Sequence, residues 1–376
     1  MAKVFVCGDI VNLFSDNQFI DISLQEIIKG SDLSVGNFEG VLSNNVLSGG
    51  LKQNASTARL LGEAGFNLLL LANNHIADNG EKGLIETVQG IEKNEIAHTG
   101  AGVGYDNAYR PYITEVNGVR IGVVNLCESH RGCYKDCSSS YGYAWLSSHN
   151  INQIITKVRQ QVDWLFVMPH AGLEHCTLPL KEFRYIYRNY CDLGADFVVA
   201  SHPHIAQGIE QYNNSTIFYS LGNFYFPRKL NDDNNIENQS FSIVFNLDDK
   251  KNNYQLVYHK LEGLKVRKID EVESAISINE LSRVLLSPEY ETMVNNQNNQ
   301  IFRSKLLRLY KEALNGIDNN DSFKKKIKIS MNYFMRELPE LSDVSYNLQL
   351  LSHLIDNESY RYLAVDVLKN NSYEKQ

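Results

Sequence analysis

The sequence predicts an α/β fold, and the main observation is a pattern that recurs through its first half. Short apolar runs, several of them rich in β-branched residues and typical of buried strands, are each followed at once by polar side chains. In open α/β sheets, ligands and catalytic groups collect beyond the carboxyl ends of the strands. A second observation is size, because 376 residues with 43% hydrophobic content suffice for one large domain and a smaller one.

Five such runs can be followed along the chain. They are residues 3–7 before Asp9, 33–36 before Glu39, 67–72 before Asn74 and His75, 163–168 before His170, and 197–200 before His202 and His204. Five strands can thus deliver these seven side chains to one sheet edge. Carboxylates, an amide oxygen and imidazoles suit Mn, Zn or Fe. We therefore expect a metal site there.

Each of these residues, taken alone, has a simpler interpretation. Asp9 suits a helix N-cap or a turn, and Glu39 lies between glycines in a stretch typical of a surface turn. Asn74 can build a turn, and His75 and His170 can be core histidines with satisfied hydrogen bonds. The metal site is the preferred hypothesis because the coincidence occurs five times at the same structural position.

The remainder of the chain predicts further strands and then helices. Strands are expected at residues 240–247 and 254–261, and Ser277 begins a capping box that opens a helix. We expect one domain over residues 1–265 and a helical appendage over residues 266–376. The appendage carries no recognised motif, so packing on the sheet domain is its expected role.

The motifs together resemble the CapA family, which is named for poly-γ-glutamate capsule synthesis and is similar to the calcineurin-like metallophosphoesterases. The resemblance covers about residues 3–262. It is carried by Gly8-Asp9, Asn37-Phe38-Glu39, Leu71 to Gly80, His170 to Glu174, Ser201-His202-Pro203-His204 and Tyr219 to Phe224. It implies a metallophosphoesterase-like four-layer αββα sandwich with two mixed sheets, followed here by the helical C-terminal region.

The resemblance also implies roles for individual residues. The implied ligands of two divalent ions (Mn, Zn or Fe) are Asp9, Glu39, Asn74, His170, His202 and His204. His75 matches an imidazole that works as a general acid. The chain departs from the family pattern at Val11, where the first motif usually has a histidine, and at Ile76, where an acidic residue usually follows. The second departure leaves Asp78 as the candidate to orient His75.

The reaction implied by such a site is hydrolysis. Two nearby cations would generate hydroxide from water and hold the oxygens of a phosphoryl group during an in-line displacement. His75 would protonate the leaving oxygen. We expect a metal-dependent, phosphoesterase-like hydrolase in capsule or surface-polymer biosynthesis. Its expected partners are a phosphorylated small molecule or anionic polymer precursor, and capsule-synthesis proteins. Two alternatives stay open: a non-hydrolytic accessory component of a poly-γ-glutamate or polysaccharide synthesis assembly, and metal-assisted hydrolysis or transfer at a γ-glutamyl amide.

Further polar residues near these motifs are candidates for substrate contact. Glu174 and His175 follow the fourth motif closely, and either could support a ligand or touch substrate. Asn223 could hydrogen-bond a metal-bound oxygen or a histidine, whereas Arg228 and Lys229 could bind a phosphate or carboxylate. A plain surface or turn role is the open alternative for these residues.

One segment concentrates soft ligands. Cys127, His130, Cys133 and Cys137 fall within eleven residues, but their spacing is not that of a common zinc finger or ribbon. Three interpretations stay open: a structural zinc site, a loop facing the substrate, and an inert loop with reduced thiols.

Composition limits the partners and the location. The net charge of −8 implies no sequence-independent affinity for nucleic acid. No apolar run reaches the roughly 18 residues that a bilayer crossing needs. The first strand begins directly after Met1 and leaves no room for a signal peptide, and the largely unclustered cysteines fit a reducing compartment. We expect no nucleic-acid partner, no membrane span and a cytoplasmic location.

Overall fold

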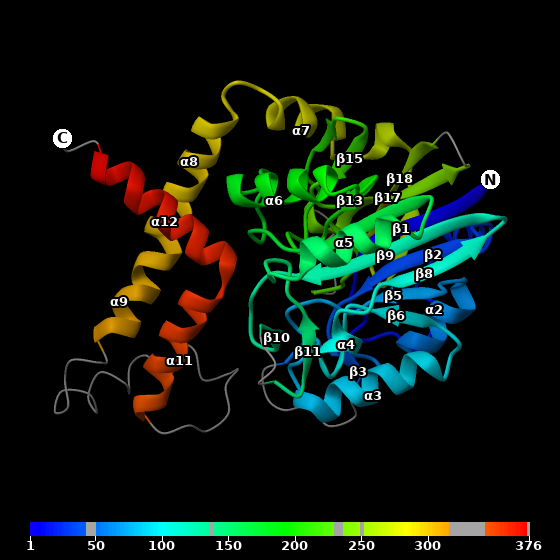
Figure 1. The fold of residues 1–376 in the computed structure, drawn as a ribbon, viewed down its shortest axis with the longest axis horizontal. Coiled ribbons are helices and arrows are strands. Elements are labelled where there is room, and N and C mark those ends of the chain that lie inside the picture. Colours follow the sequence, from blue (N-terminus) through cyan, green and yellow to red (C-terminus); the bar gives the residue numbers. More distant parts are fainter. Residues whose placement is uncertain (43–49, 136–138, 229–235, 249–251, 316–342, 374–376) are drawn as a thin grey trace.

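The computed structural model describes residues 1–42, 50–135, 139–228, 236–248, 252–315 and 343–373. Its centre is a pair of mixed β-sheets packed face to face, with helices outside them (Figure 1). The predicted fold class, an αββα arrangement with two mixed sheets and a helical C-terminal region, is confirmed.

The first sheet has a parallel centre and an antiparallel flank. Its strands run in the order β19-β18-β17-β1-β2-β5-β6, and β16 also pairs with β1. β1, β2, β5, β6 and β16 are parallel, whereas β17, β18 and β19 form an antiparallel meander. The bounds are β1 Ala2–Ile10, β2 Leu33–Phe38, β5 Leu68–Leu70, β6 Ala97–Thr99, β16 Asn223–Tyr225, β17 Gln239–Leu247, β18 Asn252–Glu262 and β19 Lys265–Lys268.

The second sheet has parallel central strands and antiparallel edges. Its order is β14-β15-β13-β12-β9-β8. The bounds are β8 Tyr112–Val116, β9 Val119–Cys127, β12 Trp164–His170, β13 Phe197–Val199, β14 Ile209–Tyr212 and β15 Ser215–Phe218. Asn117 and Gly118 both have positive φ (52° and 76°) in the β8–β9 turn, as a two-residue hairpin of type I′ requires.

The core between the sheets explains why the central strands read as apolar runs. Val4, Val35 and Leu68 of the first sheet belong to the same buried cluster as Ile121 and Phe166 of the second. The other faces of these sheets are buried as well, so most residues of the central strands are apolar. The parallel strands of each sheet end on one side, and the polar residues after them follow at that edge.

Helices bury the outer faces of both sheets. α1 (Ile22–Lys29), α2 (Thr57–Ala64) and α3 (Gly80–Glu92) pack on the first sheet. α5 (Ile151–Arg159) and α6 (Lys181–Asp192) pack on the second (Figure 1). Shorter elements complete the body: β3 Val41–Leu42, β4 Lys52–Gln53, β7 Ala101–Val103, α4 Tyr105–Ala108, β10 Cys133–Tyr134, β11 Tyr141–Ala144 and the 3₁₀ turns Ile236–Asn238 and Glu271–Glu273.

The C-terminal helices extend the α6 layer. They are α7 Ile278–Leu285, α8 Tyr290–Ile301, a π-helical turn at Phe302–Leu306, α9 Leu307–Asn315, α11 Asp343–Asp356 and α12 Glu358–Tyr373. Phe183 of α6 lies edge-on to Tyr362 of α12, with ring centroids 5.6 Å apart. The Tyr290 hydroxyl donates to the carbonyl of Pro179 at 2.9 Å. The division of the chain at residue 265 stays a prediction, and β19 begins there.

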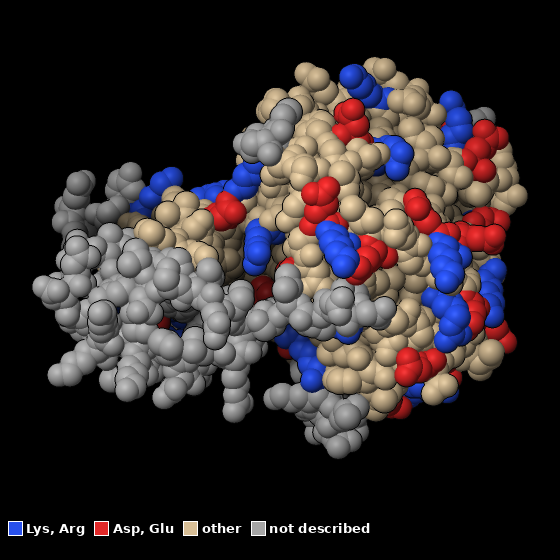
Figure 2. Space-filling view, turned by 90° about the horizontal axis from the view of Figure 1, so that it is seen from below, with Lys and Arg blue, Asp and Glu red and all other residues tan. Residues whose placement is uncertain are grey.

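The charge distribution on the surface and the length of the helices can be compared with the expected absence of nucleic-acid binding and of a membrane span. On the face seen in Figure 2, described Lys and Arg side chains are interspersed with Asp and Glu rather than gathered into one basic patch. Of the helices among the described residues, none has both the length and the apolar character that a membrane crossing requires.

Candidate metal centre

Six polar side chains predicted as ligands come together where the parallel strands of the two sheets end. We call them the ligand cluster: Asp9 at the end of β1, Glu39 after β2, Asn74 after β5, His170 at the end of β12, and His202 and His204 after β13. Asn74 is partly buried, and the other five are nearly or completely buried. Each element delivers one or two polar groups because the preceding strand is locked into an apolar core.

His170 lies at the centre of one half of the cluster. Its Nε2 is 3.0 Å from Asn74 Oδ1 and 3.0 Å from His202 Nδ1. Burial, together with the neighbouring histidines, lowers the pKa of His170 well below its usual value, so the ring is neutral. With the ring proton on Nδ1, three lone-pair-bearing atoms, Asn74 Oδ1, His170 Nε2 and His202 Nδ1, lie close together without a proton on His170 Nε2. A cation between them would satisfy all three.

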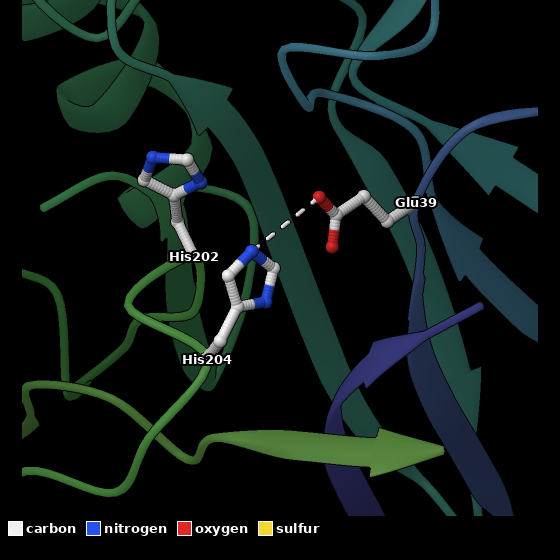
Figure 3. A group of neighbouring side chains, drawn as sticks. All are labelled: Glu39, His202 and His204. Carbon is white, nitrogen blue, oxygen red and sulfur yellow. Dashed lines mark ion pairs between the residues drawn. The ribbon is translucent and has the colours of Figure 1, made fainter. Parts of the chain in front are cut away.

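Glu39 supplies the negative charge of the cluster. Ligand atoms of Glu39, His202 and His204 all lie within 4.8 Å of one another, and Figure 3 shows Glu39 directed at His204. Glu39 Oε1 is 3.9 Å from His204 Nε2, yet both of its buried oxygens lack a hydrogen bond. Burial raises the pKa of Glu39. A buried carboxylate without a donor is costly, and a divalent cation would compensate it, so the donor set fits a metal.

Asp9 is held by two neighbours. Its Oδ1 accepts a hydrogen bond from Asn37 Nδ2 at 2.7 Å, and its Oδ2 accepts one from the His202 backbone N–H at 3.3 Å. Asn37 was assigned no role from sequence, although it lies in the same motif as Glu39. Val11, at the position of the missing histidine, is buried and apolar, so that place offers no ligand.

His204 is oriented by Asn223. Asn223 Oδ1 lies 2.9 Å from His204 Nδ1, because β16 pairs with β1 in a register that aligns Asn223 with Asp9. An Nδ1 proton shared with Asn223 leaves His204 Nε2 facing Glu39. Burial opposes protonation of His204, but Glu39 and Asp9 raise its pKa to about 9. The field that favours an imidazolium would equally favour a bound cation.

The turn that carries the two histidines has a strained backbone. His202 has a φ of 100° and His204 a φ of 62°, a region that residues other than glycine rarely occupy. Each such residue costs about 1–3 kcal/mol unless its surroundings enforce it. Here the Ser201 N–H donates to Pro169 O and Ser201 O accepts from the Ala171 N–H, both at 3.0 Å. Strand pairing therefore holds the turn against β12.

His75 stands at the open side of the cluster beside Asp78. Its Nδ1 is 2.7 Å from Asp78 Oδ2, and its Nε2 is 3.9 Å from Glu39 Oε1. Asp78 also accepts the Leu51 N–H at 2.8 Å, which fixes the carboxylate. The His75 side chain is 33% exposed. Burial opposes its protonation, but the hydrogen bond to Asp78 raises its pKa, which favours a ring that carries a proton on Nε2 as well.

Glu174, His175 and Arg228 lie outside the ligand cluster, and we call them the rim residues. The His175 ring is centred 6.1 Å from the His204 ring, and its Nδ1 is 3.0 Å from Glu237 Oε1. Arg228 pairs with Glu237 at 3.4 Å. Burial opposes ionisation of Glu174, but His202 and His204 lower its pKa to about 2. Glu237 was not among the predicted residues, and Lys229 lies outside the described residues.

Sequence reasoning missed Glu128. Its Oε1 lies 3.2 Å from His202 Nε2 and 3.4 Å from His130 Nε2, and these three residues form a second group able to hold a metal. Burial opposes ionisation of Glu128, but hydrogen bonds from His130 and His202 lower its pKa to about 2. A signal for Glu128 was present, since it follows β9 directly, as polar residues follow the neighbouring β12. The segment was instead interpreted through its cysteines.

The segment rich in cysteines is only partly described. Cys127 is a buried free thiol in β9, and Cys133 is a partly buried free thiol in β10. Cys137 lies outside the described residues, so the zinc and loop interpretations stay predictions.

Comparison with known proteins gives one family and several relatives. The family model described as "Bacterial capsule synthesis protein PGA_cap" matches residues 15–228. The "Capsule biosynthesis protein CapA" of Bacillus anthracis is 28% identical over 235 residues, covering 58% of this chain and 56% of the relative. The "PGA biosynthesis protein CapA" of Bacillus subtilis (strain 168) is 30% identical over 212 residues, covering 54% and 56%. The chain thus spans about half the length of these curated relatives.

Among solved structures, a 5'-nucleotidase precursor from Thermus thermophilus is similar with a TM-score of 0.44 and 12% identity. The match covers 79% of this chain and 60% of that one.

Proposed function

Because the chain belongs to the bacterial capsule synthesis protein family PGA_cap, we propose that it is a metal-dependent, phosphoesterase-like hydrolase serving the synthesis of a capsule or another surface polymer. The observation that carries the proposal is Glu39, a buried carboxylate without a hydrogen-bond donor that faces His204 and His75. A structural role would have supplied it with donors. A catalytic metal would occupy that place instead.

Two groups of ligands would hold the ions. Asn74, His170 and His202, together with Glu39, would bind one ion. Asp9, Glu39 and His204 would bind the other, which has one imidazole fewer because Val11 occupies its place. When bound, divalent ions such as Mn, Zn or Fe activate water as a nucleophile and neutralise charge on a phosphoryl group.

The residues of the chain would supply the proton and the orientation. His75 would hold a proton at Nε2, which faces Glu39, and would deliver it to the leaving oxygen, while Asp78 keeps the ring in that orientation. The rim residues stand where a substrate would enter. We infer that Arg228 exchanges Glu237 for an anionic group of a phosphorylated small molecule or a polymer precursor.

Metal stoichiometry is the first test. The full chain loaded with Mn or Zn is expected to bind close to two ions, and His202→Ala is expected to lose metal while keeping the wild-type circular dichroism. One ion per wild-type chain would mean that the Asp9 side is empty. A chain that binds none would contradict the hydrolase and favour the accessory role in a synthesis assembly.

Turnover is the second test. His75→Gln is expected to keep its metal and lose about 10²–10⁴-fold in hydrolysis of an aryl phosphate monoester or diester. His98→Gln is the matched control, because His98 lies on β6 and contacts Glu92 instead of the cluster. Equal turnover in wild type and His75→Gln would exclude the proton transfer. A γ-glutamyl amide tested in parallel distinguishes an amide hydrolase or transferase.

Capsule-synthesis partner proteins and a cytoplasmic location stay predictions. Cell fractionation with an antibody against the chain, followed by cross-linking, tests both of them.

A further inference from the structure

The two ring nitrogens of His202 contact two different parts of the molecule. Nδ1 faces His170 Nε2 inside the ligand cluster at 3.0 Å, whereas Nε2 faces Glu128 Oε1 at 3.2 Å. An ionised carboxylate only accepts hydrogen bonds, so Nε2 must carry the proton. In the neutral ring, the lone pair of His202 is therefore on Nδ1 and faces His170 Nε2 in the cluster, as a metal ligand requires.

Glu128 is itself held by the C-terminal helices. Its Oε2 accepts two hydrogen bonds from Ser359, at 3.0 Å from the backbone N–H and at 2.6 Å from the hydroxyl. Ser359 lies in the first turn of α12, whose beginning is the end of that helix nearer to the α/β body (Figure 1). Because Ser359 occupies Oε2, Oε1 remains for the histidines.

Neighbouring contacts fix the same junction. Glu358 accepts a hydrogen bond from the Ser129 N–H at 2.7 Å, and Asn357 Nδ2 lies 3.1 Å from His130 Nε2. Three consecutive residues at the start of α12 thus bind three consecutive residues after β9. These contacts leave the Glu128 carboxylate little freedom to rotate.

We propose that Glu128 and Ser359 are positioning residues that fix the tautomer and the orientation of His202, so that the C-terminal helical region sets the metal affinity of the ligand cluster. This inference rests on the proposed function only in that the cluster binds a divalent ion. Carboxylates that accept the second N–H of a ligating histidine typically contribute 10–100-fold to metal affinity.

Glu128→Gln tests the proposal in the full chain. A glutamine must direct its NH₂ either at the Ser359 N–H, which is also a donor, or at His202, which then carries its proton on Nδ1. Either arrangement is expected to weaken binding of Mn²⁺ or Zn²⁺ about 10–100-fold in calorimetric titration of the metal alone. The absorption spectrum of a Co²⁺ complex should change as well. Ser359→Ala keeps the backbone donor and should weaken binding measurably but less, by about twofold to tenfold.

Asp366→Asn is the matched control. Asp366 lies on the same helix and pairs with Lys181 of α6 at 2.6 Å, so its loss weakens the packing of α12 without touching Glu128. Metal affinity and the Co²⁺ spectrum should stay at the wild-type values in this variant.

The outcomes separate the two proposals. Wild type without bound metal would overturn both, whereas metal binding that Glu128→Gln and Ser359→Ala leave unchanged would overturn the positioning role alone. A loss of one whole ion in Glu128→Gln, with the others bound normally, would make Glu128 a ligand and also overturn it. If Glu128→Gln does not fold, the Ser359→Ala titration decides.

Discussion

The ligand cluster is expensive for folding at the level of single residues. Glu39 is buried without a donor, and His202 and His204 adopt left-handed backbone angles. Each feature opposes folding in the absence of a ligand and becomes useful only when a cation is bound. The cluster is thus maintained by the rigid strands around it.

Removal of the Glu39 charge should stabilise the metal-free chain. Burial disfavours the ionised form of this side chain and raises its pKa. Glu39→Gln is therefore expected to raise the free energy of unfolding by about 1 kcal/mol in chelator-treated protein, and to lower metal affinity at the same time. Urea denaturation with and without Mn²⁺ measures both effects.

Glu115→Gln is the control for this change, because Glu115 is exposed on β8 and should alter stability by less than about 0.5 kcal/mol. A metal-free Glu39→Gln chain that is less stable than wild type would show that attraction to His204 outweighs the cost of burying the charge, and would contradict this prediction.

At the scale of elements, the close approach of strands decides where the ligands lie. β1 runs beside β2 and β16, and the Asp9 N–H donates to the Gly222 carbonyl at 3.2 Å. A Cβ atom on Gly8 would lie 1.9 Å from that same oxygen. The glycine is therefore required for the two strands to meet, and the meeting sets the position of Asp9 against Asn223.

Gly8→Ala should separate β1 from β16. The expected cost is about 1–3 kcal/mol of unfolding free energy, with weaker metal binding because Asp9 moves. Gly62→Ala in α2 is the comparison, since its Cβ would meet its nearest neighbour at 3.5 Å, an ordinary contact, and a helix gains about 0.5–1 kcal/mol from the change. Equal denaturation midpoints for Gly8→Ala and wild type would refute this account.

A buried histidine on β18 makes stability depend on pH. Ser240 and Ser242 of β17 contact the ring of His259, and Phe224 packs edge-on to it. Burial lowers the pKa of His259 to about 3. Below about pH 6.5 this histidine is protonated in the unfolded chain but stays neutral in the folded chain. The free energy of unfolding is therefore highest above about pH 6.5 and falls as the pH drops toward 3.

The expected contribution of His259 is a loss of about 2 kcal/mol between pH 7.5 and pH 5. His259→Asn should reduce the pH dependence of the unfolding free energy by that amount, as measured by urea denaturation at both pH values. Parallel curves for the two proteins would show that His259 titrates normally in the fold.

At the scale of the whole molecule, the C-terminal helices and the α/β body share a core and a buried polar junction. Leu309, Leu354 and Leu363 belong to the same buried cluster as Phe183 and Tyr187 of α6. Residues 357–359 then contact the segment after β9 that orients His202. Binding at the cluster and docking of these helices should therefore stabilise each other.

Glu358→Ala should loosen this junction. The buried carboxylate accepts from the Ser129 N–H, the Trp145 indole and the Ser147 hydroxyl, and alanine leaves these donors unpaired. The free energy of unfolding is expected to fall by about 3 kcal/mol. Urea denaturation monitored by tryptophan fluorescence measures this loss. Glu291→Ala on the exposed side of α8 should change stability by under about 0.5 kcal/mol. Equal losses in the two variants would exclude a special role for Glu358.

Much of the fold could be predicted because its signals are local. Apolar runs identified the central strands, and the Asn-Gly turn at 117–118 belongs to the hairpin type that its residues favour. Packing of the C-terminal helices on the sheet domain was expected, but their place on α6, the strand order and the pairing of β16 with β1 were not predicted. They depend on contacts between distant segments, which periodicity does not encode.

The residues that stand at the carboxyl ends of the strands could be read from local patterns, because a polar residue directly after a buried apolar run comes where a strand ends. These patterns gathered Asp9, Glu39 and His202 into one hypothesis. How their atoms face one another, and which groups orient them, depends on contacts that form when the chain folds. Glu128 and Ser359 are 231 positions apart, and they meet because α12 returns to the end of β9, a consequence of packing that no local pattern contains.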